Sequence, residues 1–182
     1  MATYAERLRQ VWDELERDRM SLFSQLRTLS DIAYNQAPTP GKWSVGQIVN
    51  HLFLSEQLSM GYVRKKMNAP DAIPPYGPGS WLGLQGIRFM FVSPFTFKAP
   101  KMIDMWGDQP VLDAAELDRQ WTAVRQEMIR DVEAYASIIG NKRVYRHPRA
   151  GRMSLRHMLL FFDIHFRHHR RQVDRIIRGM NA

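Results

Sequence analysis

Residues 154–179 read SLRHMLLFFDIHFRHHRRQVDRIIRG, and they are the clearest sign of the fold class in this chain. Their apolar side chains return every three or four positions, which is the period of an amphipathic α-helix with one face against a core. Ser154 is a typical N-cap residue, so we expect a helix from there to about Gly179. Five apolar residues mark its inward face: Leu155, Phe162, Val173, Ile176 and Met180.

Two histidines of this helix, His165 and His169, are four positions apart. Each residue of an α-helix advances by roughly 100°, so side chains with this spacing lie on nearly the same face. The same count places His169 almost in line with Phe162, on the inward face. His157 and His168 come out more than roughly 100° from Phe162, which predicts that both are solvated surface histidines. His165 and His169 are therefore the candidates for a shared buried site.

Three further amphipathic helices are expected earlier in the chain. Apolar residues at helical spacing predict them over residues 4–32, 45–67 and 113–139. Ser44 and Asp113 are N-cap residues for the second and third of these helices, and Gly140 is a C-cap glycine for the third. Four such helices can bury their apolar stripes only against one another, so the predicted fold class is an all-α four-helix bundle.

The connection between the second and third helices, residues 68–110, holds seven prolines. Proline interrupts regular structure, so we expect a long loop with short helical turns that packs over the bundle or lines a pocket. Its length favours a crossover topology. Its apolar part, residues 81–97, is too short and too polar to span a membrane. Two roles are open for the aromatic residues of this loop: they line a small-ligand pocket, or they form loop core and dimer contacts. These residues are Trp81, Phe89, Phe91, Phe95, Phe97 and Trp106.

His51 lies in the second helix, at the border of its apolar stripe, and can face inward. A lone inward histidine is more often a core imidazole with a hydrogen-bond partner than a metal ligand. Three inward histidines, His51, His165 and His169, favour a divalent metal site, because three imidazoles leave a coordination position open for chemistry. Spacing alone leaves open whether the second and fourth helices are neighbours.

The composition limits the other classes of function. With 182 residues, 45% of them hydrophobic, the chain is expected to form one domain over residues 1–182. It contains no cysteine, so disulfides and cysteine-ligated metals are excluded. The net charge of +8 is spread along the chain, which disfavours nucleic acid as a partner. The first ten residues lack the apolar stretch of a secretory signal, which favours a cytoplasmic location.

Two motifs resemble the DinB-like superfamily of metal-binding four-helix bundles. Residues 42–52, KWSVGQIVNHL, resemble the start of that family's second helix, where a Trp-Ser turn precedes a His-Leu pair. Residues 147–155, HPRAGRMSL, together with the two histidines and the glutamine that follow, resemble its closing helix. The resemblance covers essentially the whole chain. It implies a crossover connection, frequent homodimers, and a nickel, zinc or similar ion held by three histidines, which match His51, His165 and His169.

The same resemblance implies two kinds of enzyme acting on a small-molecule substrate. One is an S-transferase that uses a low-molecular-weight thiol such as bacillithiol or mycothiol, and the other is a metal-dependent hydrolase. The bound metal would lower the pKa of the thiol or of water. Gln172, Asn50 and Arg88 are candidate assisting residues. The alternative is a non-catalytic protein that binds a metal or a small ligand, since fold alone does not choose among functions.

Overall fold

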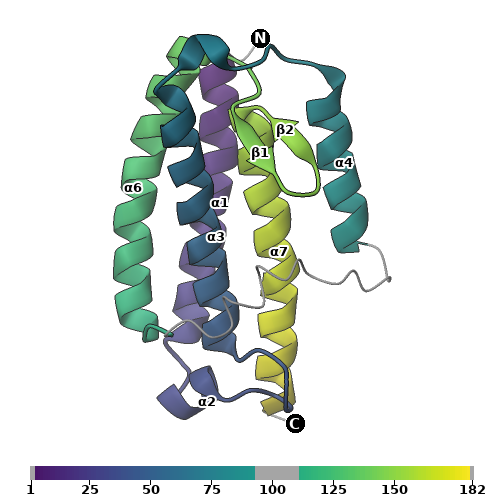
Figure 1. Cartoon of the computed structure of the whole chain (residues 1–182). Helices are drawn as coiled ribbons and strands as arrows, with labels where there is room; N and C mark the ends of the chain where they lie inside the picture. Colours follow the sequence, from purple (N-terminus) through teal and green to yellow (C-terminus); the bar gives the residue numbers. More distant parts are fainter. Residues whose placement is uncertain (1–2, 93–110, 181–182) are drawn as a thin grey trace.

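The computed structural model describes residues 3–92 and 111–180, which are mainly helical (Figure 1). Its elements in chain order are α1 (Tyr4–Leu26), α2 (Asp31–Asn35), α3 (Val45–Met67), the short 3₁₀ helix η1 (Pro70–Ala72), α4 (Pro78–Val92), α6 (Ala114–Ile139), β1 (Tyr145–His147), β2 (Gly151–Met153) and α7 (Leu155–Met180). Within the described residues, no helix is long and apolar enough to cross a membrane.

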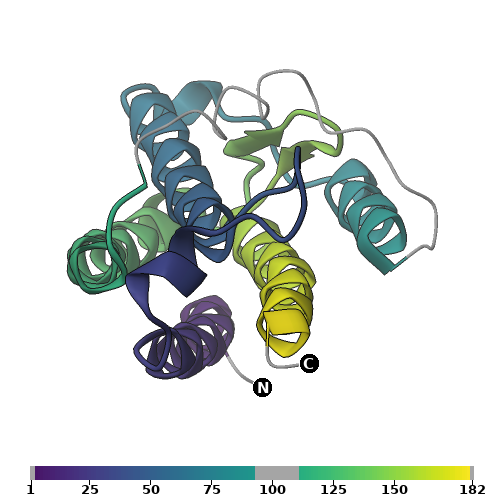
Figure 2. The same cartoon turned by 90° about the horizontal axis from the view of Figure 1, so that it is seen from below.

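Four of these helices, α1, α3, α6 and α7, form the predicted bundle. α1 packs against α6 and α7, and α3 packs against the same two helices, so α1 and α3 lie at opposite corners (Figure 2). α3 and α6 run in the same direction, whereas α1 and α7 run in the other (Figure 1). Part of the connection between α4 and α6 lies outside the described residues, so the crossover stays a prediction.

The helix boundaries follow from local capping. The Ser44 hydroxyl accepts a hydrogen bond from the Gln47 backbone N–H, and the Gln47 side chain accepts one from the Ser44 backbone N–H. These two N–H groups at the start of α3 have no partner within the helix, and the side chains supply one. Asp113 caps α6 through the backbone N–H of Glu116. Gly140 ends α6 with a φ of 53°, a backbone conformation that favours glycine. α3, α6 and α7 begin and end within one residue of the ranges expected from the sequence.

The predicted first helix, residues 4–32, is wrong at its C-terminal end. α1 ends at Leu26, and a separate short helix, α2, begins after Ser30. The Ser30 hydroxyl accepts a hydrogen bond from the backbone N–H of Ala33, which starts a new helix with a new direction. The apolar periodicity continues through this break, which is why the pattern alone did not reveal it.

The prediction of only short helical turns in residues 68–110 is also wrong, because α4 is a 15-residue helix. Pro78 occupies its first position, where the missing N–H of proline costs no hydrogen bond. Gly83 lets α4 approach the hairpin closely, since a Cβ at this position would lie 2.2 Å from the carbonyl oxygen of Ala150. Phe95, Phe97 and Trp106 lie outside the described residues.

A β-hairpin, which the sequence did not predict, precedes α7. β1 and β2 are antiparallel, and Tyr145 faces Met153, Arg146 faces Arg152 and His147 faces Gly151. Strands of three residues are too short to show an alternating pattern that can be told from a loop. The hairpin and α4 lie together on the side of α7 that is away from α1 and α6 (Figure 2).

Among the described residues, the buried apolar side chains of the bundle form two clusters. One, which includes Leu15 and Met128, draws on the start of α1 and α7 and the end of α3 and α6. The other, which includes Phe23 and Trp121, draws on the opposite ends of these four helices. Two groups of buried polar side chains lie within the bundle. One lies between α1, α3 and α6, and the other, which contains the three predicted histidines, lies between α3 and α7.

Candidate metal centre

The side chains of His51, His165 and His169 meet between α3 and α7. The Nε2 atom of His165 lies 3.1 Å from Nε2 of His51 and 3.0 Å from Nε2 of His169. The three residues are 3%, 7% and 8% exposed. His165 and His169 lie one turn apart on α7, and α3 packs on the face that carries them. The structure therefore brings together the three histidines that the sequence singled out, and it shows that the second and fourth bundle helices are neighbours.

Burial keeps these imidazoles neutral. It lowers the pKa of His51 to about 4. Burial also lowers the pKa of His165 and of His169 well below the usual value for histidine, and the neighbouring imidazoles act in the same direction. A neutral imidazole has one nitrogen lone pair to donate, and this is the form that binds metal ions.

Gln172 sets the orientation of His169. The Nδ1–H of His169 donates to Oε1 of Gln172 over 2.8 Å, so the lone pair of His169 is on Nε2, the atom that faces the other two histidines. The amide nitrogen of Gln172 in turn donates to Nε2 of His168, 3.2 Å away. A hydrogen bond to the far nitrogen of a ligating histidine is the usual way in which proteins orient such a ligand.

Aromatic rings border the histidine cluster. Phe161 stacks on His165 with ring centroids 5.3 Å apart and an angle of 13° between the planes. The Trp43 ring lies 5.1 Å from the His51 ring. Such rings limit the orientations that the imidazoles can adopt, and they keep water away from their faces.

His147, on β1, is a neighbour of this site that the sequence reasoning did not single out. Its ring lies 4.6 Å from that of Phe161, which separates it from His165. Its Nδ1 accepts the backbone N–H groups of Arg149 and Ala150, so its proton is on Nε2. Burial lowers its pKa to about 4. The Pro-Arg-Ala-Gly run that follows His147 is a turn signal that could have indicated the hairpin.

The donor set fits a divalent transition metal. One hydrogen atom can be shared by only two of these three Nε2 atoms, whereas a single cation can accept a lone pair from all three. Within residues 3–92 and 111–180, no other group of three or more His, Asp or Glu side chains brings its donor atoms together in this way, and no fourth such side chain joins this one. Three imidazoles with one open position are typical of catalytic rather than structural zinc sites, and they also suit nickel, copper and iron.

The other histidines of α7 differ in their surroundings. His157 is 5% exposed, so its prediction as a solvated surface residue is wrong. The reason is α4, which covers the start of α7 and places the Ser80 hydroxyl against Nδ1 of His157. His168 is half-buried and stays outside the cluster, although its ring lies 5.1 Å from that of His169. Met180, predicted to face inward, is 37% exposed because it lies in the last turn.

The remaining predicted site residues are not gathered around the histidines. Asn50 is buried on α3, and Arg88 is exposed on α4. Of the three residues predicted to assist the metal site, Gln172 is the one that makes a hydrogen bond with a clustered histidine within the described residues. Trp81 and Phe89 are 52% and 65% exposed. These two rings therefore point toward solvent in this chain and do not line a buried pocket.

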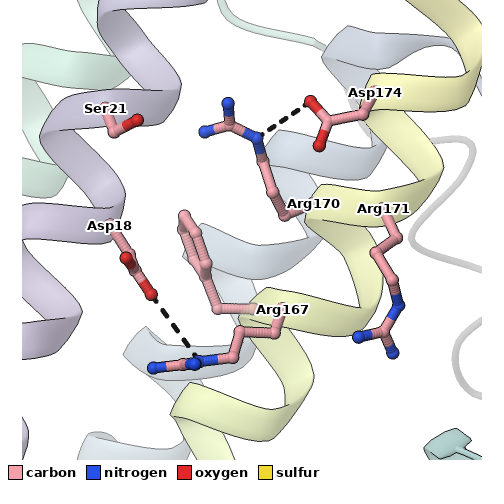
Figure 3. A pocket seen from close by; sticks show the side chains of 7 residues that line it. Asp18, Ser21, Arg167, Arg170, Arg171 and Asp174 are labelled. Atoms are coloured by element: carbon pink, nitrogen blue, oxygen red, sulfur yellow. Dashed lines mark hydrogen bonds and ion pairs between the residues drawn. The ribbon is translucent and has the colours of Figure 1, made fainter.

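A surface cavity of about 420 Å³ lies between α1 and α7 (Figure 3). Its wall carries ion pairs between Arg167 and Asp18 and between Arg170 and Asp174. The three histidines do not line it. The cavity is thus a cleft bridged by paired charges on another face of α7, separate from the histidine cluster.

Comparisons with known proteins agree with this architecture. The model of the DinB superfamily matches residues 14–173. A search of curated proteins finds no significant match. The solved structure of YfiT from Bacillus subtilis, described as a probable metal-dependent hydrolase with an unusual four-helix bundle topology, is similar with a TM-score of 0.60 and 14% sequence identity. The match covers 100% of this chain and 91% of that chain, and at this identity it shows the fold alone. The family match extends over most of the sequence and includes all three clustered histidines, and we conclude that the chain belongs to the DinB superfamily.

Proposed function

We propose that this protein binds one divalent transition metal ion, nickel or zinc, through His51, His165 and His169, and that it is a metal-dependent enzyme acting on a small molecule. The observation that carries the proposal is the convergence of three buried, neutral Nε2 atoms with no fourth protein ligand among the described residues. When bound, the ion supplies Lewis acidity that lowers the pKa of a water molecule or a thiol in its open position.

The residues of the chain prepare the site for that role. Gln172 holds the His169 ring so that Nε2 faces its partners. Phe161 and Trp43 hold the rings of His165 and His51 and limit access of bulk water, which strengthens electrostatic effects inside the site. His147 packs on Phe161 beside the site and stays uncharged, with its proton on Nε2.

Of the two enzyme classes, we favour hydrolysis. The similar structure of YfiT is described as a probable metal-dependent hydrolase, and three nitrogen ligands with one open position are the arrangement used to activate water. Transfer of a low-molecular-weight thiol is the second candidate. It rests on the resemblance to a superfamily that includes thiol-dependent transferases, and it predicts an absolute need for added thiol.

The first test is the metal content of the untagged full-length protein after reconstitution with nickel or zinc. We expect one equivalent of metal in the unmodified protein and a loss of metal in each of His51→Ala, His165→Ala and His169→Ala. His168→Ala is the matched control, because it removes the same side chain at the position next to a ligand and should keep the metal. Metal retained in His165→Ala, or lost in His168→Ala, contradicts the site.

The second test compares activities of the metal-loaded and metal-free protein. Turnover of esters or amides by the loaded protein without thiol supports a hydrolase. Turnover that appears only with an added thiol supports the transferase instead. A protein that binds the metal tightly and turns over neither class of substrate supports the non-catalytic alternative and contradicts the proposed hydrolase.

A further inference from the structure

Basic residues occur along the whole chain, but acidic residues are missing from the segments that form α4, the hairpin and the start of α7. The sequence has no aspartate or glutamate in residues 72–103 or in residues 134–162. The second of these segments carries six cations: Lys142, Arg143, Arg146, Arg149, Arg152 and Arg156. The chain as a whole has a net charge of +8, so much of the excess charge lies here.

Two of these arginines face each other across the hairpin. Arg146 and Arg152 are directly opposite in the antiparallel register, and both are exposed. Like charges at directly opposite positions destabilise a strand pair. The side chain of neither arginine makes a hydrogen bond or an ion pair with a residue in the described part of the chain. The outward face of the hairpin thus holds a repulsive pair that an anionic partner would relieve.

α4, next to the hairpin, is apolar on its outer side as well as its inner side. Leu84 and Ile87 are buried, whereas Trp81, Leu82 and Phe89 are 52%, 58% and 65% exposed. Arg88 is exposed between Leu82 and Phe89 in sequence, and its side chain makes no hydrogen bond or ion pair with any described residue. Large apolar side chains clustered on one exposed helix face mark an interaction surface.

These features lie on two adjoining elements, α4 and the hairpin, and outside the histidine cluster. We refer to Trp81, Leu82, Arg88, Phe89, Arg146 and Arg152 together as the α4–hairpin surface. α4 packs against β2, and both lie on the side of α7 away from α1 and α6 (Figure 2). Strand alternation places Arg146 on the opposite face of β1 from His147, which packs on Phe161 beside the metal site.

We propose that the α4–hairpin surface docks on an anionic phospholipid bilayer. Its cations attract the negative surface of the bilayer, and Trp81, Leu82 and Phe89 insert among the lipid headgroups. A second copy of the chain is a poorer occupant, because a symmetric contact would oppose one basic surface to another. Nucleic acid would satisfy the arginines but would offer no apolar environment for Leu82.

The test is flotation of the full-length protein with lipid vesicles. We expect binding to vesicles of phosphatidylcholine mixed with phosphatidylglycerol, little binding to phosphatidylcholine alone, and weaker binding as salt increases. Arg146→Gln combined with Arg152→Gln should reduce partitioning about thirtyfold, since each basic residue near such a surface contributes about a factor of five. Leu82→Ser combined with Phe89→Ser should reduce it about tenfold or more at every salt concentration.

Matched controls lie on other faces of the molecule. Arg17→Gln with Arg130→Gln removes two exposed arginines of α1 and α6, and Ile32→Ser with Ile138→Ser removes two apolar side chains that are 77% and 62% exposed. Neither control should change partitioning. Equal losses in control and test variants, or no preference for anionic vesicles, would overturn the proposal.

Two further outcomes would identify a different occupant and also overturn it. One is binding of duplex DNA, but not of vesicles, that depends on Arg146 and Arg152. The other is a dimer in analytical ultracentrifugation that Leu82→Ser with Phe89→Ser dissociates. Both measurements are independent of the metal site, so loss of the proposed enzymatic function would leave this test unaffected.

Discussion

Two groups of buried polar side chains lie within the bundle, and they differ in how their bonding capacity is used. Between α1, α3 and α6, Arg125 is 1% exposed and donates to both carboxylate oxygens of Glu56, to the carbonyl oxygen of Leu15 and to Glu16. The indole N–H of Trp121 donates to the same Glu56 carboxylate. This charge cluster is closed, because its donors and acceptors are paired within the protein.

The histidine cluster between α3 and α7 is open. Three neutral imidazoles direct nitrogen atoms at one another, and a hydrogen atom on one of them could satisfy only one neighbour. A closed cluster stabilises one arrangement of helices and has no polar atom left to bind a ligand. An open cluster has nitrogen atoms that can coordinate a metal ion. The comparison contrasts a paired charge cluster on one side of α3 with a cluster of potential metal ligands on the other side, where we propose the metal site.

The largest expected effect is on the closed cluster. Glu56→Ala leaves the Arg125 charge buried without its main partner, and we expect the free energy of unfolding to fall by about 3–5 kcal/mol. Urea denaturation measures this loss. Metal content of the folded variant should be unchanged. A loss below about 1 kcal/mol would mean that Arg125 finds other partners and that the cluster is not closed.

Bound metal should raise the free energy of unfolding of the unmodified protein. It should have no such effect in a variant that lacks one of the three histidines. Nickel or zinc at about one hundred times its Kd should raise the free energy of unfolding by about 2.7 kcal/mol in the unmodified protein and by nothing measurable in His165→Leu. In the metal-free state, His165→Leu should differ from the unmodified protein by about 1 kcal/mol or less, because an apolar side chain of similar size replaces a neutral imidazole whose hydrogen bonds contribute about 1 kcal/mol net. A loss as large as that of Glu56→Ala would make the histidines a structural network instead.

Gln172→Ala tests how strongly metal binding by the histidine cluster depends on the hydrogen bond between Gln172 and His169. Removing the hydrogen bond that orients His169 should weaken metal binding about 10- to 100-fold, with the fold intact. Isothermal titration calorimetry with zinc gives the affinity, and circular dichroism monitors the helices. Gln57→Ala, at an exposed position of α3, is the matched control. An unchanged affinity in Gln172→Ala would mean that packing alone orients the ring.

The smallest effect on the free energy of unfolding is expected for a charge cluster between α3 and α6 that lies at the surface. Arg64 of α3 pairs with Asp131 and Glu127 of α6, and its side chain is 42% exposed. Arg64→Gln should cost about 0.2–1 kcal/mol, and less at high salt, because water and ions screen these charges. Urea denaturation at low and high salt checks this. A loss of unfolding free energy close to that of Glu56→Ala would show that the large effect at Glu56 comes from ion pairing and not from burial.

Several features could be predicted because they depend on local sequence. The long helices follow from apolar periodicity and from caps such as Ser44 and Asp113, which act within a few residues. The pairing of His165 with His169 follows from helix geometry alone. The family assignment also rests on local motifs, and its match to residues 14–173 confirms it.

Other features depend on contacts between distant segments. The burial of His157 requires α4 to cover α7, and the position of His147 requires the hairpin to fold back on Phe161. The exposure of Trp81 and Phe89 also depends on which face of α4 meets the bundle, and an almost wholly apolar helix gives no signal of that choice.

The sequence by itself determined the long helices α3, α6 and α7, the caps of α3 and α6, and the histidine pair of α7, because hydrogen bonds within a helix and side-chain spacing are set by neighbouring residues. Only the tertiary structure decided that His51 joins that pair, that Glu56 and Arg125 form a closed cluster, and that α4 covers His157. Each of these contacts joins residues from different helices, and their meeting depends on how whole apolar faces pack together.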